Sequence, residues 1–211
     1  MRRLPVYLVL DTSGSMFGEP IEALNNALSE MINMLRTDPQ AVDSLWISII
    51  TFNREVAELV PLTDLVSFQL PQIKCPRSGP THTGLALEVL YDKITQNLRK
   101  NTATERGDWK PLFFLFTDGK PSDLQLYNAM IPKIKTLQLG AIIACAAGPQ
   151  ANSALLLDLT PNVVRLETAD GKTLKQFFRW VSESIEQGNK SQGTGESVSL
   201  PPPPAELNLV I

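Results

Sequence analysis

The chain has 211 residues, of which 43% are hydrophobic, and this suits one globular domain with a full core. Only 19% of the residues are charged, the net charge is -3 and no long basic run is present, so nucleic-acid binding driven by phosphate neutralisation is not expected. No apolar stretch approaches the length of a membrane-spanning helix, and we expect no membrane partner. The apolar run after Arg2 and Arg3 is too short for a signal peptide and ends at Asp11, so we expect a cytoplasmic protein with free thiols at Cys75 and Cys145.

Short apolar runs rich in β-branched and aromatic residues recur along the chain and predict strands. They lie at Val6–Leu10, Leu45–Phe52, Ala57–Leu62, Leu112–Thr117, Ala141–Ala147 and Val163–Leu166. The runs are continuous rather than alternating, which is typical of strands covered on both faces. The short connection between the second and third runs, at residues 53–56, predicts a hairpin with an antiparallel edge strand.

Amphipathic patterns between these runs predict helices. They cover residues 21–35, 85–98, 123–137 and 174–185, with a short helix within 151–159. Strands that alternate with helices predict an α/β fold: a doubly wound, mostly parallel central sheet with one antiparallel edge strand and helices on both faces. In such sheets ligands bind beyond the carboxyl ends of the strands, where the chain order reverses.

The composition changes after Gln187. Residues 188–199 are mostly small and polar, and a run of four prolines follows at 201–204. We therefore expect a domain over residues 1–187 and a flexible Gly/Ser then Pro-rich tail over 188–211. The tail either is free or docks on the domain in extended form, and its proline run could also bind a proline-recognition domain.

Three polar loops are expected at one edge of the sheet. "DTSGS" (Asp11 to Ser15) follows the first strand, "TDGKP" (Thr117 to Pro121) follows the fourth, and "SGPTHTG" (Ser78 to Gly84) leads into a helix. Apart from His82, these loops offer oxygen ligands and no nitrogen or sulfur. Hard oxygen ligands suit Mg²⁺, Mn²⁺ or Ca²⁺ rather than zinc.

The order of D-x-S-x-S, a threonine and T-D-G resembles the metal-ion-dependent adhesion site of von Willebrand factor A domains, over about residues 4–187. The five matching positions are Asp11, Ser13, Ser15, Thr81 and Asp118. Thr81 is chosen because the family's ligand precedes the x-T-G that opens the helix, and Thr83 is its competitor.

The resemblance implies a role for each residue. Ser13, Ser15 and Thr81 would bind the metal directly through neutral hydroxyls, and Asp11 and Asp118 would act through waters and hydrogen bonds. One position of the octahedral shell would stay open for an Asp or Glu carboxylate of a protein partner. The residues expected at the rim of this partner site are Phe17, His82 and Lys120.

The ending "LPPPPAELNLVI" resembles that of the bacterial tellurite-resistance TerY proteins. This resemblance implies a stress-response role, with a protein kinase and a metal-dependent phosphatase as partners encoded nearby.

Three other interpretations stay open beside this non-catalytic interaction module. Asp11 and the serines could be only a helix N-cap, although a cap requires neither Thr81 nor Asp118. Two carboxylates and a metal could also serve a phosphoester hydrolase, although a phosphatase nucleophile at Asp11 usually has a second carboxylate where Ser13 stands. Finally, the protein could be a scaffold that acts through its tail.

Overall fold

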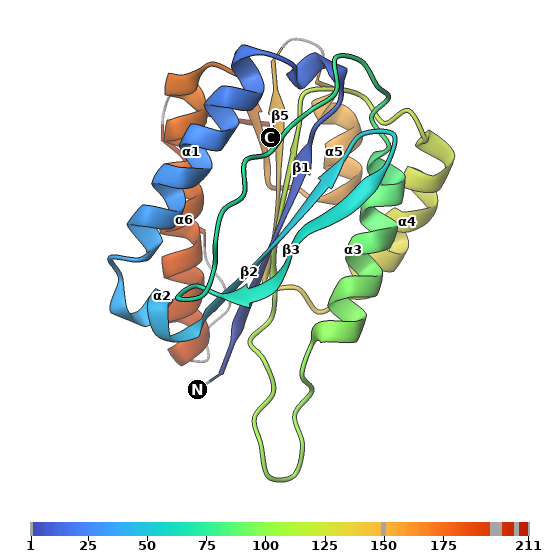
Figure 1. The fold of residues 1–211 in the computed structure, drawn as a ribbon. Helices are drawn as coiled ribbons and strands as arrows, with labels where there is room; N and C mark the ends of the chain where they lie inside the picture. The colour runs from blue at the N-terminus through green and yellow to red at the C-terminus, as the bar shows by residue number, and fades with distance from the viewer. Residues whose placement is uncertain (1, 149–150, 195–199, 205–206, 211) are drawn as a thin grey trace.

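Seven strands form one sheet with helices on both of its faces (Figure 1). The computed structural model describes residues 2–148, 151–194, 200–204 and 207–210. The strands are Leu4–Asp11 (β1), Leu45–Phe52 (β2), Val56–Asp64 (β3), Leu112–Thr117 (β4), Ala141–Ala147 (β5), Val163–Leu166 (β6) and Asn208–Val210 (β7). The helices are Gly14–Met16 (η1, a 3₁₀ turn), Glu19–Leu35 (α1), Pro39–Ser44 (α2), Thr83–Asn97 (α3), Leu124–Thr136 (α4), Ser153–Leu159 (α5) and Gly171–Thr194 (α6).

The strand order is β3-β2-β1-β4-β5-β6-β7. β1 pairs in parallel with both β2 and β4, so the chain order reverses between β1 and β4. β3 pairs antiparallel with β2 at one edge, through a turn in which the N–H of Asn53 donates to the Glu55 carbonyl at 3.0 Å. The predicted fold class and the hairpin with its edge strand are confirmed.

The central strand β1 is buried along its whole length. Leu8 and Leu10 point into the core that α1 and α6 cover, whereas Tyr7 and Val9 point into the core under α3, α4 and α5. Both faces of the strand therefore require apolar side chains, which explains the continuous apolar runs in the sequence.

An aromatic cluster joins α6 to the sheet. The rings of Phe177 and Phe178 lie edge to face with their centroids 5.1 Å apart, and Phe116 of β4 lies 6.1 Å from Phe178. α1 packs beside α6 on this face (Figure 1). Edge-to-face pairs add to the free energy gained by burying the rings, so this cluster anchors the helical layer.

The tail makes more structure than the predicted flexible segment. α6 continues past Gly188 to Thr194, because the buried amide of Asn189 donates to Ser44 Oγ at 2.8 Å and holds the helix against α2. Beyond it, the Trp180 indole N–H donates to the Pro201 carbonyl at 3.0 Å, and Leu207 is buried. β7 then pairs antiparallel with β6 and gives the sheet a second antiparallel edge strand, which the sequence analysis did not predict. Beyond α6, the described residues 200–204 and 207–210 thus dock in extended form, one of the two alternatives.

The cysteines and the helices can be compared with what the composition predicts. Cys75 and Cys145 are both free thiols, and Cys145 is buried in β5. Within the part of the chain that the structure describes, no helix has the length and apolar character needed to cross a membrane.

We predict that Gly84→Ala destabilises the fold by about 1–3 kcal/mol, the usual cost of overpacking. A Cβ at this position would lie 2.4 Å from the backbone nitrogen of Tyr127, which α4 cannot move without losing its packing on α3. Gly171→Ala is the matched control, since a Cβ there has no neighbour within 4 Å. Urea unfolding of both variants measures the effect, and equal stabilities would contradict the prediction.

Candidate metal centre

The candidate site lies where the chain order reverses, at the carboxyl ends of β1 and β4. The register pairs Leu10 with Phe116, so Asp11 and Thr117, the last residues of their strands, become neighbours. Thr117 Oγ1 donates a hydrogen bond of 2.6 Å to Asp11 Oδ2. The loops that leave these two strands diverge here, and this leaves room for a ligand between them.

Asp11 is a fully buried carboxyl group with donors on both oxygens. Its Oδ1 accepts a bond of 2.8 Å from the N–H of Ser13, and its Oδ2 accepts the bond from Thr117. Burial raises the pKa of Asp11 to about 6; the bonds from Thr117 and Ser13 oppose this rise, and the nearby charge of Asp118 adds to it. Because both oxygens are engaged, Asp11 shapes the loop, and this agrees with the indirect role that the resemblance implies.

Ser13, Ser15 and Asp118 place a row of oxygen atoms beside Asp11. Ser13 Oγ lies 3.1 Å from Ser15 Oγ, which donates to Asp118 Oδ1 at 2.8 Å. Burial raises the pKa of Asp118 as well. Ser13 is buried while Ser15 is exposed, so the row of oxygens reaches solvent at Ser15.

Thr81 reaches the same place from the segment before α3. Ser122 holds it on both sides of its backbone: Ser122 Oγ accepts from the Thr81 N–H at 3.0 Å, and the Ser122 N–H donates to the Thr81 carbonyl at 2.8 Å. A Cβ on Gly119 would lie 3.1 Å from Thr81 Oγ1, so this hydroxyl lies against the residue that follows Asp118. The structure therefore brings all five predicted residues together at one edge of the sheet.

Thr83 is the alternative to Thr81. It is fully buried at the start of α3, and its Oγ1 has no hydrogen-bond partner. An unpartnered buried hydroxyl is also compatible with a ligand role. The position of the Thr81 hydroxyl beside Gly119 favours Thr81, and the two threonines can be separated by experiment.

The donor set fits a hard divalent cation. Among the residues that the structure describes, the ion pairs involve other carboxylates, and neither Asp11 nor Asp118 has a cationic partner. A bound dication would lower both raised pKa values. In the described ranges no three His, Cys, Asp or Glu side chains gather, so a metal here would rely on hydroxyl oxygens.

The three predicted rim residues differ in how they are held. Phe17 is 51% exposed, and Lys120 is also exposed. His82 is half-buried: its Nδ1 lies 2.9 Å from the Arg54 carbonyl, and its N–H donates to the Asn53 carbonyl at 3.0 Å. His82 therefore links the middle loop to the β2–β3 turn, and its role at the rim stays a prediction.

Several residues that hold the loops were missed by the sequence analysis. Asp123 accepts bonds from the N–H groups of Gly84 (3.0 Å) and Leu85 (2.8 Å), which have no partners within α3. Ser122 and Thr117 hold Thr81 and Asp11, as described above. An aspartate just before the apolar pattern of α4 indicates a cap for α4; that it caps α3 follows only from the packing of the two helices.

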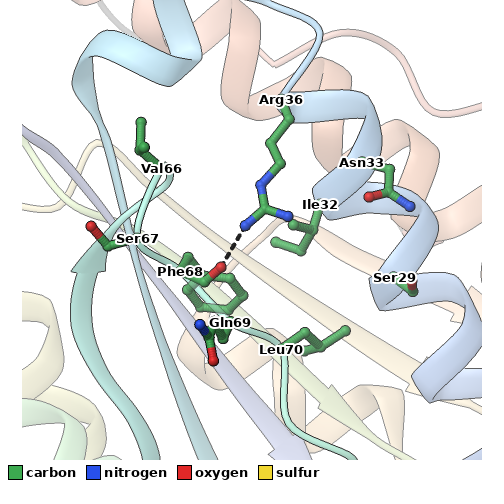
Figure 2. Close-up of a pocket in the computed structure, with 9 residues that line it drawn as sticks. All are labelled: Ser29, Ile32, Asn33, Arg36, Val66, Ser67, Phe68, Gln69 and Leu70. Atoms are coloured by element: carbon green, nitrogen blue, oxygen red, sulfur yellow. Dashed lines mark hydrogen bonds between the residues drawn. The ribbon is translucent and has the colours of Figure 1, made fainter.

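The segment between β3 and Thr81 is held by α1. The side chain of Asn25 donates to the Ile73 carbonyl (2.9 Å) and accepts from the Ile73 N–H (2.8 Å). Arg36, just after α1, donates to the Phe68 carbonyl at a pocket of about 420 Å³ (Figure 2). Its guanidinium also donates to the Leu65 carbonyl. This pocket lies near the amino end of β2, away from the candidate site, because the Leu65 N–H donates to the Leu45 carbonyl.

Residues 6–180 match the family model described as the von Willebrand factor type A domain. A search of proteins with curated functions found no significant match.

Solved structures share the fold at low sequence identity. Proximal thread matrix protein 1 from the mussel byssus is 15% identical with a TM-score of 0.63, and the match covers 86% of this chain and 48% of that chain. BatB from Bacteroides thetaiotaomicron is 14% identical with a TM-score of 0.57, and the match covers 89% of this chain and 100% of that chain. A further structure of the mussel protein has zinc in its metal-ion-dependent adhesion site (MIDAS) motif. It is 15% identical with a TM-score of 0.59, and the match covers 90% of this chain and 46% of that chain. This chain thus spans about half the length of the mussel protein's chain.

We predict that Asp123→Ala lowers the free energy of unfolding by about 0.5–2 kcal/mol, the usual cost of losing a helix cap. The same change should weaken divalent metal binding, because the α3 N-terminus that follows Thr81 loses its tie to the loop of Asp118. Asp123→Asn retains one acceptor oxygen and should recover part of both effects. Chemical denaturation and metal titration measure them, and an Asp123→Ala variant with wild-type values in both would refute the proposed tie.

Proposed function

The chain belongs to the von Willebrand factor type A domain family, and from this premise we propose that it is a non-catalytic, metal-dependent protein-interaction module. The observation that carries the proposal is the row of oxygens from Ser13 through Ser15 to Asp118, with the Thr81 hydroxyl beside it, at the reversal point of the sheet.

We assign the metal to Ser13, Ser15 and Thr81 as direct ligands, with Asp11 and Asp118 as charge-balancing and orienting groups. Mg²⁺ suits neutral oxygen ligands and keeps part of its own hydration, and Mn²⁺ and Ca²⁺ are the alternatives. The zinc reported in the mussel protein's MIDAS motif supports a divalent ion in general. A bound dication supplies an electrophilic centre for an Asp or Glu carboxylate of a protein partner.

The cellular setting is proposed from resemblance alone. The C-terminal ending, which resembles that of the tellurite-resistance TerY proteins, supports a cytoplasmic stress-response role with a kinase and a metal-dependent phosphatase as partners. The interaction function does not depend on this setting.

A metal-dependent phosphoester hydrolase would need a general base or nucleophile beside the metal. His82 is the only histidine of the chain, and its Nδ1 lies against the Arg54 carbonyl. Turnover of p-nitrophenyl phosphate that disappears in Asp118→Ala would favour the hydrolase.

We predict that Thr81→Val raises the dissociation constant for Mg²⁺ and Mn²⁺ by at least about tenfold, as the loss of a ligand requires. Thr83→Val, which has the same shape change, should leave the constant unchanged. Calorimetric titration of both variants makes the comparison, with EDTA-treated wild type as the starting material. If Thr83→Val loses affinity and Thr81→Val does not, the assignment of the two threonines is reversed; if wild type binds neither ion, the metal site is rejected.

We predict that the protein captures its partner from native cell extract in Mg²⁺ and loses it in EDTA or in Thr81→Val. Deletion of residues 200–211 distinguishes the metal-dependent module from a scaffold that acts through its tail. The deletion removes the docked tail and leaves the residues of α6 and of the candidate site in place. Partner loss on deletion with unchanged metal affinity would favour the tail. If EDTA and Thr81→Val both leave the captured amount of partner unchanged, the partner binds to a surface that does not depend on the metal.

A further inference from the structure

An exposed aromatic ring stands at the mouth of the candidate metal site. Phe17 follows the 3₁₀ turn that carries Ser15, and its N–H donates to the Gly14 carbonyl at 3.2 Å. Half of its surface faces solvent. One exposed apolar residue is ordinary on a protein surface, so its meaning depends on what lies next to it.

The neighbour of Phe17 is Arg77, whose guanidinium lies 5.6 Å from the ring centroid. Arg77 is anchored to the same turn as the ring: the Gly14 N–H donates to the Gly79 carbonyl at 3.5 Å, and a Cβ on Gly14 would lie 2.5 Å from the Cα of Ser78. The backbone of 78–79 therefore packs directly on the loop that carries the two serines. The pair has a defined place relative to the candidate ligands.

The contact with Phe17 leaves the guanidinium of Arg77 exposed to solvent. A guanidinium at this distance from a ring gains a cation–π attraction and still has N–H groups that can pair with a carboxylate. In the described part of the chain the ion pairs use Arg3, Lys93 and Lys175, so Arg77 forms none with the acidic residues described there.

Arg77 is one of four exposed cations in the loops near this edge, with Arg54, Lys74 and Lys120. Exposed acidic residues lie here as well: Glu19 and Glu22 in the first turn of α1, Glu55 in the β2–β3 turn and Glu167 after β6. The charges of the whole edge therefore do not select a partner. The exposed guanidinium of Arg77, anchored beside the loop of the two serines, is the group that favours an acidic ligand.

We propose that Arg77 and Phe17 form a second subsite, which binds a second carboxylate of the partner segment whose first carboxylate reaches the metal. The inference rests on the proposed function, because it takes the metal-bound carboxylate as its starting point. The partner is thus a protein segment with two acidic residues close in sequence. Arg77 makes the ion pair, and the ring of Phe17 holds its guanidinium in place.

The test uses fluorescein-labelled Gly/Ser peptides that carry either one Asp or two Asp residues separated by one, two or three positions. Fluorescence anisotropy in Mg²⁺ gives their dissociation constants for the full chain. We expect the second Asp to strengthen binding about fivefold at its best spacing, the upper range for an exposed ion pair. The measured quantity is the ratio of the dissociation constant of the one-Asp peptide to that of the best two-Asp peptide. Arg77→Gln should reduce this ratio to about one without changing the affinity for Mn²⁺ or for the one-Asp peptide, and Phe17→Leu should reduce it in part.

Arg106→Gln is the matched control, since Arg106 is an exposed arginine in the loop before β4, and it should keep the full ratio. A wild-type ratio of one at every spacing, no binding of any two-Asp peptide, or a ratio that Arg77→Gln leaves intact would overturn the inference. Failure of the proposed function looks different: peptide binding would then be equal in Mg²⁺ and EDTA. If the ratio stays high in EDTA but falls to one in Arg77→Gln, Arg77 binds the peptide and the first carboxylate does not bind through a metal ion.

Discussion

Asp11 ends the central strand with no exposed surface, and an ionised carboxylate in that place requires hydrogen-bond donors. Thr117 supplies one from the end of β4, and the N–H of Ser13 supplies another from the next loop. The Ser13 donor is local, whereas Thr117 reaches Asp11 only because β1 and β4 are parallel neighbours that end at the same level. These donors offset only part of the free-energy cost of burying the charge, so the pKa of Asp11 stays raised. A bound cation would lower this pKa. The fold at this edge and its candidate chemistry thus depend on the same buried charge.

The other loops are positioned by contacts with one another as well as by the sheet. Ser122 holds the backbone of Thr81, and Asp123 caps the helix that follows it. Gly14 lets the segment at Ser78 lie against the first loop, where any side chain would collide. The three connections that contain Gly14, Thr81 and Asp118 are therefore joined into one surface. The contacts of Ser122 and Asp123 bring Thr81 to Asp118, and the packing of Gly14 on Ser78 brings Arg77 to Phe17, so the candidate site and its rim are held by neighbouring contacts.

The main elements of the fold were predictable because buried parallel strands need continuous apolar runs. Four of the six predicted strands have the bounds seen in the structure and the other two lie within two residues of them, and the main helices are where the apolar periodicity placed them. Beside the 3₁₀ turn η1, two elements were missed, α2 and β7, and each for a physical reason. α2 is too short to show periodicity, and its signal is only the cap of Asp38 before Pro39. β7 exists because β6 offers an unpaired edge, and no local pattern of three residues reveals that.

The residue types and their order predict the kind of site: an acidic residue at the end of a buried strand, hydroxyls two and four positions later, and a strand-terminal T-D-G suit a hard cation. Tertiary structure decided which residues hold that site in shape. Ser122 reaches Thr81 across 41 positions of the chain, and Asp123 reaches Gly84 across 39. The cation–π contact of Arg77 with Phe17 likewise joins two loops that are far apart in sequence. Local patterns encode strands, helices and ligand types, whereas hydrogen bonds and ring contacts between separate crossovers depend on how the sheet brings those crossovers together.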